Sequence, residues 1–257
     1  MTAFERVKAA RAKGRPTALA YIEKLTTSFT EFHGDRRSGD DPAVVAGVAE
    51  IGGLPVTVIA IEKGADTAGR LKRNFGAAHP EGYRKALRQM KLAEKFGRPV
   101  LCLIDTSGAY CGINAEERGQ GQAIAENLME MMVLHVPVLS VIIGEGGSGG
   151  ALALAVADEV WMMENAVYSV ISPEGCASIL WKDSSRTEEA SERLKLTAED
   201  LRALGIIERI IGEQGGVENA FALLSLRIRD FFGEKLEIPT ERLLDERYEK
   251  YRKIGRV

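Results

Sequence analysis

The chain has 257 residues, of which 45% are hydrophobic and 28% are charged, and its formal net charge is −3. This balance is typical of a folded globular protein and excludes a disordered chain. The small negative charge excludes a bulk electrostatic attraction to nucleic acid or to an anionic membrane. No apolar run approaches the roughly 18 residues that indicate a membrane span.

The N-terminus and the cysteines favour a reduced, cytoplasmic setting. Residues Met1 to Arg15 are basic and alanine-rich without an apolar centre, so we expect an amphipathic helix rather than a secretory signal. The three cysteines, Cys102, Cys111 and Cys176, form no C-x-x-C pair. They therefore indicate neither a disulfide framework nor a zinc site, and we expect no metal in this chain.

The first third of the chain predicts helical and loop segments followed by a β-hairpin. Residues 1–45 are expected to be helical and then loop-like, ending in the polar turn cluster 34–42. Two β-rich runs follow, 44–51 and 54–61, joined by Gly52-Gly53. Two such runs across a Gly-Gly turn are typical of a hairpin.

From residue 80 onward the pattern alternates between helix and strand. The helices expected are 81–96, 116–134, 151–157, a short one between Thr197 and Gly205, 217–232 and 240–253, and the strands are 100–104, 138–143, 160–163 and 167–171. The strands are continuous apolar runs, which indicates burial on both faces of a mainly parallel sheet. We divide the chain into an N-terminal helical segment (1–45), a core (46–215) and C-terminal helices (216–257), all within one domain.

The most informative segment is Gly-Glu-Gly-Gly-Ser-Gly-Gly at positions 144–150, between an expected strand and an expected helix. Glycines let another molecule approach the main chain closely. The unpaired N–H groups of the next helix point into the same space. We therefore expect an anion-stabilising pocket, and the alternative is that the glycines only permit tight packing of strand against helix.

Two familiar motifs overlap this segment. Residues 146–150 match the G-x-S-x-G nucleophile elbow, but that hydrolase order needs a histidine after the serine, and all three histidines precede Ser148. Residues 144–149 match G-x-G-x-x-G, with Glu164 placed twenty residues beyond Gly144 as in a dinucleotide site. The short following helix and the position in mid-chain argue against that site. A Walker loop is excluded because no lysine follows the last glycine.

A third interpretation of the segment is an oxyanion hole made of backbone amides, which needs no histidine. The residue pattern alone leaves this interpretation and the dinucleotide loop about equally supported. The surrounding motifs decide between them. They are Arg73–Gly76, Pro80–Ala86, Ile104–Tyr110, Ala115–Gln120, Gly144–Gly150 and Tyr168–Trp181. Together they resemble the α subunit of bacterial acetyl-CoA carboxylase carboxyltransferase, from about Arg15 to about Ile211.

The resemblance implies an α/β, crotonase-like fold, a spiral of repeated ββα units with outer helices. It implies a biotin-dependent enzyme subunit that transfers the carboxyl group of carboxybiotin to acetyl-CoA, giving malonyl-CoA for fatty acid biosynthesis. The biotin is carried on the biotin carboxyl carrier protein, and biotin carboxylase is implied in the wider complex. The implied partner is a zinc-ribbon β subunit in an α2β2 heterotetramer, without which the chain is inactive.

The resemblance also assigns roles to residues of this chain. The amides of Gly149 and Gly150 would stabilise negative charge on the carboxybiotin side, while Gly146, Gly147 and Ser148 shape the turn and are candidate binding residues on the biotin and CoA side. The segment of Gly108, Ala109 and Tyr110 would form a neighbouring wall on the biotin and CoA side. Lys72, Arg73, Arg84 and Lys85 are candidates for contacts with CoA phosphates or with the partner, and the alternative is a solvated basic face.

The chain departs from the family pattern at a few positions. Ser107 stands where proline is usual, Asn114 replaces a usual glycine, and Ala78-His79 is more polar than the common pattern. Loss of the proline removes a restriction on φ and should loosen the loop. The departures keep a second hypothesis open, a non-catalytic scaffold or paralogue that only binds a β-like partner.

Overall fold

The predicted hairpin opens the central sheet. In the computed structural model, which describes residues 1–255, β2 (Val44–Ile51) and β3 (Leu54–Ile61) pair antiparallel. The turn residues Gly52 and Gly53 have φ angles of 58° and 83°. Glycine adopts this left-handed conformation without strain, and a two-residue hairpin turn requires it. The predicted strands and turn are confirmed.

The sheet is mixed, with an antiparallel part at its start and a parallel part beyond it. Its strand order is β1-β2-β3-β4-β5-β6-β8, and β7 pairs with the end of β5. The remaining strands are β1 (Ser28–Glu31), β4 (Val100–Thr106), β5 (Val138–Gly147), β6 (Glu159–Met163), β7 (Val167–Ser169) and β8 (Arg209–Ile211). All pairings from β3 to β8 are parallel, as the alternation of helix and strand predicts.

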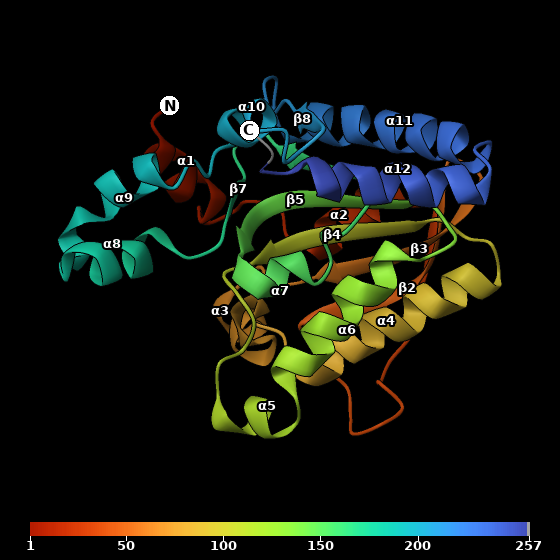
Figure 1. The fold of residues 1–257 in the computed structure, drawn as a ribbon, viewed down its shortest axis with the longest axis horizontal. Helices are drawn as coiled ribbons and strands as arrows, with labels where there is room; N and C mark the ends of the chain where they lie inside the picture. The colour runs from red at the N-terminus through yellow and green to blue at the C-terminus, as the bar shows by residue number, and fades with distance from the viewer. Residues whose placement is uncertain (256–257) are drawn as a thin grey trace.

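Helices cover both faces of this sheet. They are α1 (Ala3–Ala10), α2 (Ala18–Leu25), α3 (Thr67–Lys72), α4 (Pro80–Lys95), α5 (Ile113–Glu117), α6 (Gln120–Met132), α7 (Ser148–Leu152), α8 (Pro173–Trp181), α9 (Thr187–Arg193), α10 (Ala198–Ala203), α11 (Val217–Leu236) and α12 (Thr240–Lys253), with short 3₁₀ turns at Asn74–Gly76 and Ser184–Arg186. Helix α4 packs on β2 and β3, whereas α2 packs on β3 and β4. Figure 1 shows α8 and α9 as an arm that projects beyond the sheet. None of the helices within residues 1–255 is both long and apolar enough to cross a bilayer.

One large hydrophobic core joins segments from all parts of the chain. Tyr21 of α2, Trp161 of β6 and Phe232 of α11 belong to the same buried cluster. Strand β4 is buried along its whole length. Because the apolar side chains of the sheet interior are removed from water on both faces, its strand ends are held firmly in place.

The structure corrects the predicted elements around the glycine-rich segment. The strand expected at 138–143 continues to Gly147, because its end pairs with β7 from Glu145 to Gly147. The following helix therefore begins at Ser148 rather than at 151, and it ends at Leu152. The helix predicted at 116–134 is in fact two helices, α5 and α6, divided at Gly119, whose φ of 81° interrupts the helical backbone.

Candidate functional site

Two backbone turns meet where β4 and β5 end side by side. Thr106, the last residue of β4, is paired with Gly146 of β5. A β-carbon on Gly147 would lie 2.2 Å from the carbonyl oxygen of Ser107. A β-carbon on Gly150 would lie 2.5 Å from the nitrogen of Ala109. Glycine at both positions is what permits the two turns to touch.

The contact brings several backbone N–H groups close to one another. The amides of Gly149 and Gly150 belong to the first turn of α7, where N–H groups have no partner within the helix. Among residues 1–255, the N–H of Ala109 has no hydrogen-bond acceptor. The N–H of Gly108, by contrast, donates to the hydroxyl of Thr106 at 3.0 Å, which holds the loop against the strand end.

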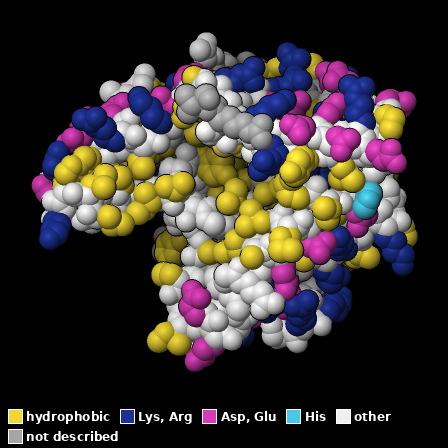
Figure 2. All heavy atoms as spheres, in the orientation of Figure 1, with side chains coloured by type: hydrophobic (Ala, Val, Ile, Leu, Met, Phe, Trp, Pro, Cys, Tyr) yellow, Lys and Arg dark blue, Asp and Glu magenta, His cyan; other side chains and the backbone are white. Residues whose placement is uncertain are grey.

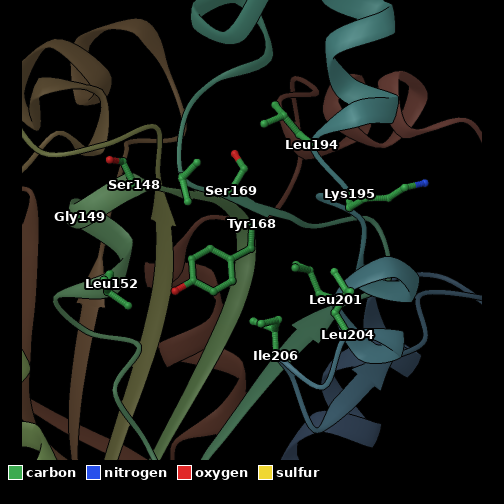
Figure 3. Close-up of a pocket in the computed structure, with 11 residues that line it drawn as sticks. Ser148, Gly149, Leu152, Tyr168, Ser169, Leu194, Lys195, Leu201, Leu204 and Ile206 are labelled. Atoms are coloured by element: carbon green, nitrogen blue, oxygen red, sulfur yellow. The ribbon is translucent and has the colours of Figure 1, made fainter. Parts of the chain in front are cut away.

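A cavity of about 440 Å³ opens beside these amides (Figure 3). Its lining comes from α7, from β7 and the residue after it, and from the segment that leads into and out of α10. The lining residues are Ser148, Gly149, Leu152, Tyr168, Ser169, Val170, Leu194, Lys195, Leu201, Leu204 and Ile206. Burial raises the pKa of Tyr168 to about 12, so its phenol stays protonated at neutral pH.

Most of this cavity lining was missed in the sequence analysis. The residues from 194 to 206 lie some fifty positions after the glycines and reach them only through the tertiary fold. Only the structure shows that two of the lining residues, Val170 and Leu204, are 79% and 60% exposed. Exposed apolar side chains beside a cavity mark a binding surface.

Tyr110 lies apart from the cavity, although the sequence groups it with Gly108 and Ala109. Its ring is stacked against His79 with 4.1 Å between ring centroids. The N–H of Tyr110 donates to the carbonyl of Ala78 at 3.0 Å, and the side chain of Gln120 donates to the carbonyl of Tyr110 at 2.8 Å. The structure therefore places Tyr110 against the starts of α4 and α6, and Tyr110 does not line the cavity beside Gly149.

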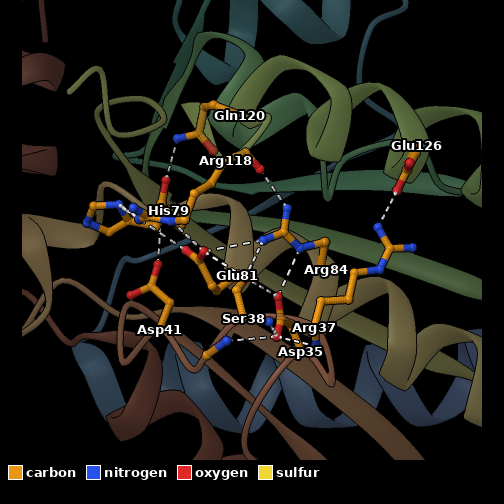
Figure 4. A network of polar contacts seen from close by, with 12 residues as sticks. Asp35, Arg37, Ser38, Asp41, His79, Glu81, Arg84, Arg118, Gln120 and Glu126 are labelled. Carbon is orange, nitrogen blue, oxygen red and sulfur yellow. Dashed lines mark hydrogen bonds and ion pairs between the residues drawn. The ribbon is translucent and has the colours of Figure 1, made fainter. Parts of the chain in front are cut away.

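A second cavity of about 490 Å³ adjoins a dense polar network (Figure 4). Asp35 accepts a hydrogen bond from Arg84 Nε at 2.9 Å. Lys85 is fully buried, and its Nζ donates to Asp40 at 2.6 Å. The expectation that Lys85 is available to CoA phosphates or to a partner is wrong, because its ammonium group is buried and hydrogen-bonded to Asp40 and to the carbonyl of Asp41. Lys72 is exposed and lines the cavity.

A chain of ion pairs lies beneath the two turns. Asp105 is 2% exposed, and its Oδ1 lies 2.7 Å from Lys63 Nζ and accepts the N–H of Glu145 at 2.8 Å. Burial raises the pKa of Asp105, and the charge of Lys63 opposes that rise. Arg11, the residue after α1, joins the carboxylates of Glu145 and Glu174, at 2.7 Å each. These contacts fasten the ends of β4 and β5 to each other and to α1.

The geometry does not favour a hydrolase. Ser148 is exposed with a φ of 52°, which does resemble the strained backbone of a nucleophile elbow. Among the described residues, however, each histidine is engaged elsewhere. His33 contacts Asp40, His79 stacks on Tyr110, and His135 contacts Glu94.

A dinucleotide loop is not favoured either. Gly144, Gly146 and Gly147 lie within β5, not in a turn between strand and helix. The carboxylate of Glu164 accepts the N–H of Glu213 at 2.9 Å. Within residues 1–255, no group of three or more histidine, cysteine, aspartate or glutamate residues is arranged to hold a metal ion.

Solved structures with a similar fold are carboxyltransferases and a decarboxylase. The transcarboxylase 12S core superposes with a TM-score of 0.70 at 19% sequence identity. The matched region is 84% of this chain and 40% of the transcarboxylase chain. A chain of a Pseudomonas malonate decarboxylase hetero-tetramer in complex with coenzyme A has a TM-score of 0.70 at 18% sequence identity. The matched region is 89% of this chain and 91% of the decarboxylase chain. These likenesses define the class by its fold, and the predicted crotonase-like α/β fold is confirmed.

The sequence defines the family. The family model described as acetyl co-enzyme A carboxylase carboxyltransferase-like matches residues 1–255. Relatives named acetyl-coenzyme A carboxylase carboxyl transferase subunit alpha are 64% identical over 258 residues in Ruminiclostridium cellulolyticum and 57% over 261 in Clostridium acetobutylicum. Both alignments cover 100% of this chain, and they cover 99% and 95% of the relatives. The chain therefore belongs to the family of acetyl-CoA carboxylase carboxyltransferase α subunits, and the predicted family and enzyme class are confirmed.

Proposed function

We propose that the turns at residues 107–109 and 147–150 form one half of a carboxyltransferase centre in which acetyl-CoA is converted to malonyl-CoA. The observation that carries this proposal is the convergence of unpaired backbone amides. The first-turn amides of α7 and the amide of Ala109 meet at Gly150, beside the cavity that Gly149 lines.

The chemistry explains why amides are the useful groups here. Removing a methyl proton from acetyl-CoA places negative charge on the thioester oxygen. Donors that are aimed at developing charge stabilise it by roughly 3–4 kcal/mol each without any movement at the moment of reaction. When bound, biotin supplies the carboxyl group and then a nitrogen that accepts the methyl proton. No side-chain base is needed from this chain.

The positions of the residues support the following assignment of roles. Gly149 and Gly150, together with Ala109, provide amides on the carboxybiotin side. Gly147 and Gly108 keep the two turns in contact. Ser148 is a turn residue at the cavity mouth and not a nucleophile.

The cavity suits the group that these residues would hold. Leu152, Leu201 and Ile206 give it apolar walls, which match the hydrocarbon part of biotin. Its volume of about 440 Å³ lies within the roughly 300–1,000 Å³ that small-molecule sites occupy.

The half-site needs a partner to complete it. The relatives are named as α subunits, which makes this chain one subunit of a multi-subunit carboxyltransferase. We assign the opposite half to a zinc-ribbon β subunit in an α2β2 assembly in the cytoplasm, with biotin delivered by a carrier protein that biotin carboxylase loads. Ile179 and Leu180 on α8 are 70% and 62% exposed. Figure 2 shows apolar side chains gathered on the projecting arm, which overhangs a hollowed region of the surface, as an interface would require.

The reverse reaction tests the proposal. The chain and its β partner, mixed with biotin and malonyl-CoA, should yield acetyl-CoA, and neither subunit alone should do so. The scaffold hypothesis, which Ser107 and Asn114 suggest, expects a complex to form without this activity. Absence of acetyl-CoA from a purified, correctly assembled complex would therefore favour the scaffold.

A further inference from the structure

Helix α7 is too short to hold its own orientation. It has only five residues, Ser148–Leu152. Isolated helices of that length do not persist in water, because a single turn scarcely repays the cost of nucleation. The direction of its first-turn amides therefore depends on the contacts at both ends of the helix, including the segment that follows it. That segment continues through tight turns to Ala157.

Three side chains from three different elements bind the backbone of this following segment, two of them fully buried and one partly buried. Asn127 of α6 donates to the carbonyl of Ala153 at 3.2 Å. Ser140 of β5 donates to the carbonyl of Leu154 at 2.5 Å. Both side chains are fully buried, so water does not compete for these carbonyls.

The third side chain comes from the C-terminal helix. The hydroxyl of Tyr251 accepts the N–H of Ala157 at 2.8 Å and donates to the carbonyl of Ala155 at 2.9 Å. A phenolic hydroxyl carries one donor and also accepts, so both bonds form together. Tyr251 thereby closes the end of the segment on which α7 is mounted.

Helix α12 is itself locked to the start of β5. Arg247, 1% exposed, forms two hydrogen bonds with the carboxylate of Asp158, at 2.8 and 3.0 Å. Asp158 also accepts the N–H of Val138, the first residue of β5, at 2.7 Å. A bidentate arginine–carboxylate pair has a fixed geometry. The position of Tyr251 is therefore tied to the same strand whose far end leads into α7.

We propose that Tyr251 is a positioning residue for carboxyl transfer. By binding Ala155 and Ala157 it fixes α7, and with it the amides of Gly149 and Gly150. This inference rests on the function proposed above for those amides. The C-terminal helix thus belongs to the support of the reaction centre, although it does not reach the reacting groups.

The test is Tyr251→Phe in the assembled complex, compared with Tyr248→Phe. Tyr248 lies on the same helix but is 54% exposed, so it is a matched control. For acetyl-CoA formation from malonyl-CoA and biotin, we expect kcat to fall about tenfold in Tyr251→Phe with KM changed less than about twofold, because misplaced groups cost rate more than affinity. Hydrogen exchange of amides 149–157 should accelerate in Tyr251→Phe alone.

Several results would overturn the inference. They are an unchanged kcat in folded Tyr251→Phe, unchanged exchange at 149–157, or an equal loss in Tyr248→Phe. If Tyr251→Phe does not assemble, Ser140→Ala, which removes the bond to Leu154, carries the same prediction. If activity is lost in Gly149→Val but kept in Tyr251→Phe and Ser140→Ala, only the positioning role is contradicted. Activity kept in Gly149→Val as well contradicts the proposed function itself.

Discussion

Gly150 and Ala109 lie in direct contact across the two turns, so close that a β-carbon on Gly150 would be 2.5 Å from the nitrogen of Ala109. Real β-carbons do not approach backbone atoms that closely. The contact joins the loop after β4 to the first turn of α7, which are about forty residues apart in the chain. It therefore makes one site of two motifs that the sequence presents separately.

Substitution of the two neighbouring glycines should have opposite effects on stability. Gly150→Ala forces backbone atoms apart, and overpacking of this kind costs about 1–3 kcal/mol of unfolding free energy. At Gly149 the nearest atoms to an added β-carbon are those of Ile124, at 3.8 Å, an ordinary contact. Gly149→Ala should therefore fold with unchanged or slightly raised stability, since alanine favours helix. Urea unfolding of both variants checks this, and equal midpoints would contradict it.

The buried carboxylate of Asp105 should depend on Lys63. Lys63→Met leaves Asp105 without its cation in a site where the carboxylate is 2% exposed. Removing one partner of a buried pair costs about 3 kcal/mol or more. Lys72→Met, at an exposed position, is the control and should change little. Chemical unfolding measures both, and a loss in Lys63→Met no larger than in the control would refute the dependence.

Asp35 should make stability sensitive to acid. Burial opposes its ionisation, but N–H donors from Gly39 and Arg37 and the side chain of Arg84 outweigh that effect and hold its pKa well below the usual range. A carboxyl whose folded pKa is lowered stabilises the fold above its unfolded pKa of about 3.9, and this stabilisation is lost as pH falls through that value towards the folded pKa.

The measurement is unfolding free energy at pH 7 and at pH 3. Asp35→Asn should lose about 2 kcal/mol at pH 7, since hydrogen bonds to a charged group are removed. The deficit should shrink at pH 3, where the wild-type carboxylate also loses its advantage. Asp245→Asn, at an exposed position on α12, is the matched control and should behave as wild type at both pH values. A deficit that grows in acid would show that the sign is wrong.

Restoring the usual proline at position 107 should be tolerated. Thr106 is in β4, an extended conformation that suits a residue before proline. Among the described residues, the N–H of Ser107 makes no hydrogen bond that proline would remove. Ser107→Pro should therefore raise the unfolding free energy by about 0.5 kcal/mol by restricting the unfolded chain. A thermal midpoint below that of the wild type would indicate that φ at this position does not fit proline.

Local patterns predict the elements whose signals are contained in their own residues. The Gly52-Gly53 hairpin and helix α12 have the predicted bounds, because turn glycines and helical charge patterns act over a few residues. The residues at the end of strand β5 do not by themselves indicate where the strand stops. Glycine usually ends a strand, but pairing with β7 carries β5 through Gly147, and only tertiary contacts reveal that pairing.

The candidate site likewise has one part that the sequence predicts and another that only the fold reveals. The glycine-rich segment predicts that other atoms approach its backbone closely, and the structure shows that these atoms belong to Ser107 and Ala109. The apolar wall around α10 and the anchoring hydroxyl of Tyr251 carry no sequence signal that links them to the glycines. Their contribution depends on the fold that brings them within reach.

The most direct measurement of the central claim is the rate at which the assembled α and β subunits form acetyl-CoA from malonyl-CoA and biotin, with wild-type chain and with Gly149→Val. The side chain of valine at this position would extend beside the cavity that Gly149 lines. We predict turnover by the wild-type complex and a loss of about 100-fold or more in the variant, because the branched side chain would obstruct access to the amides, and loss of one oxyanion donor costs about this much. An equal rate in both complexes would contradict the account.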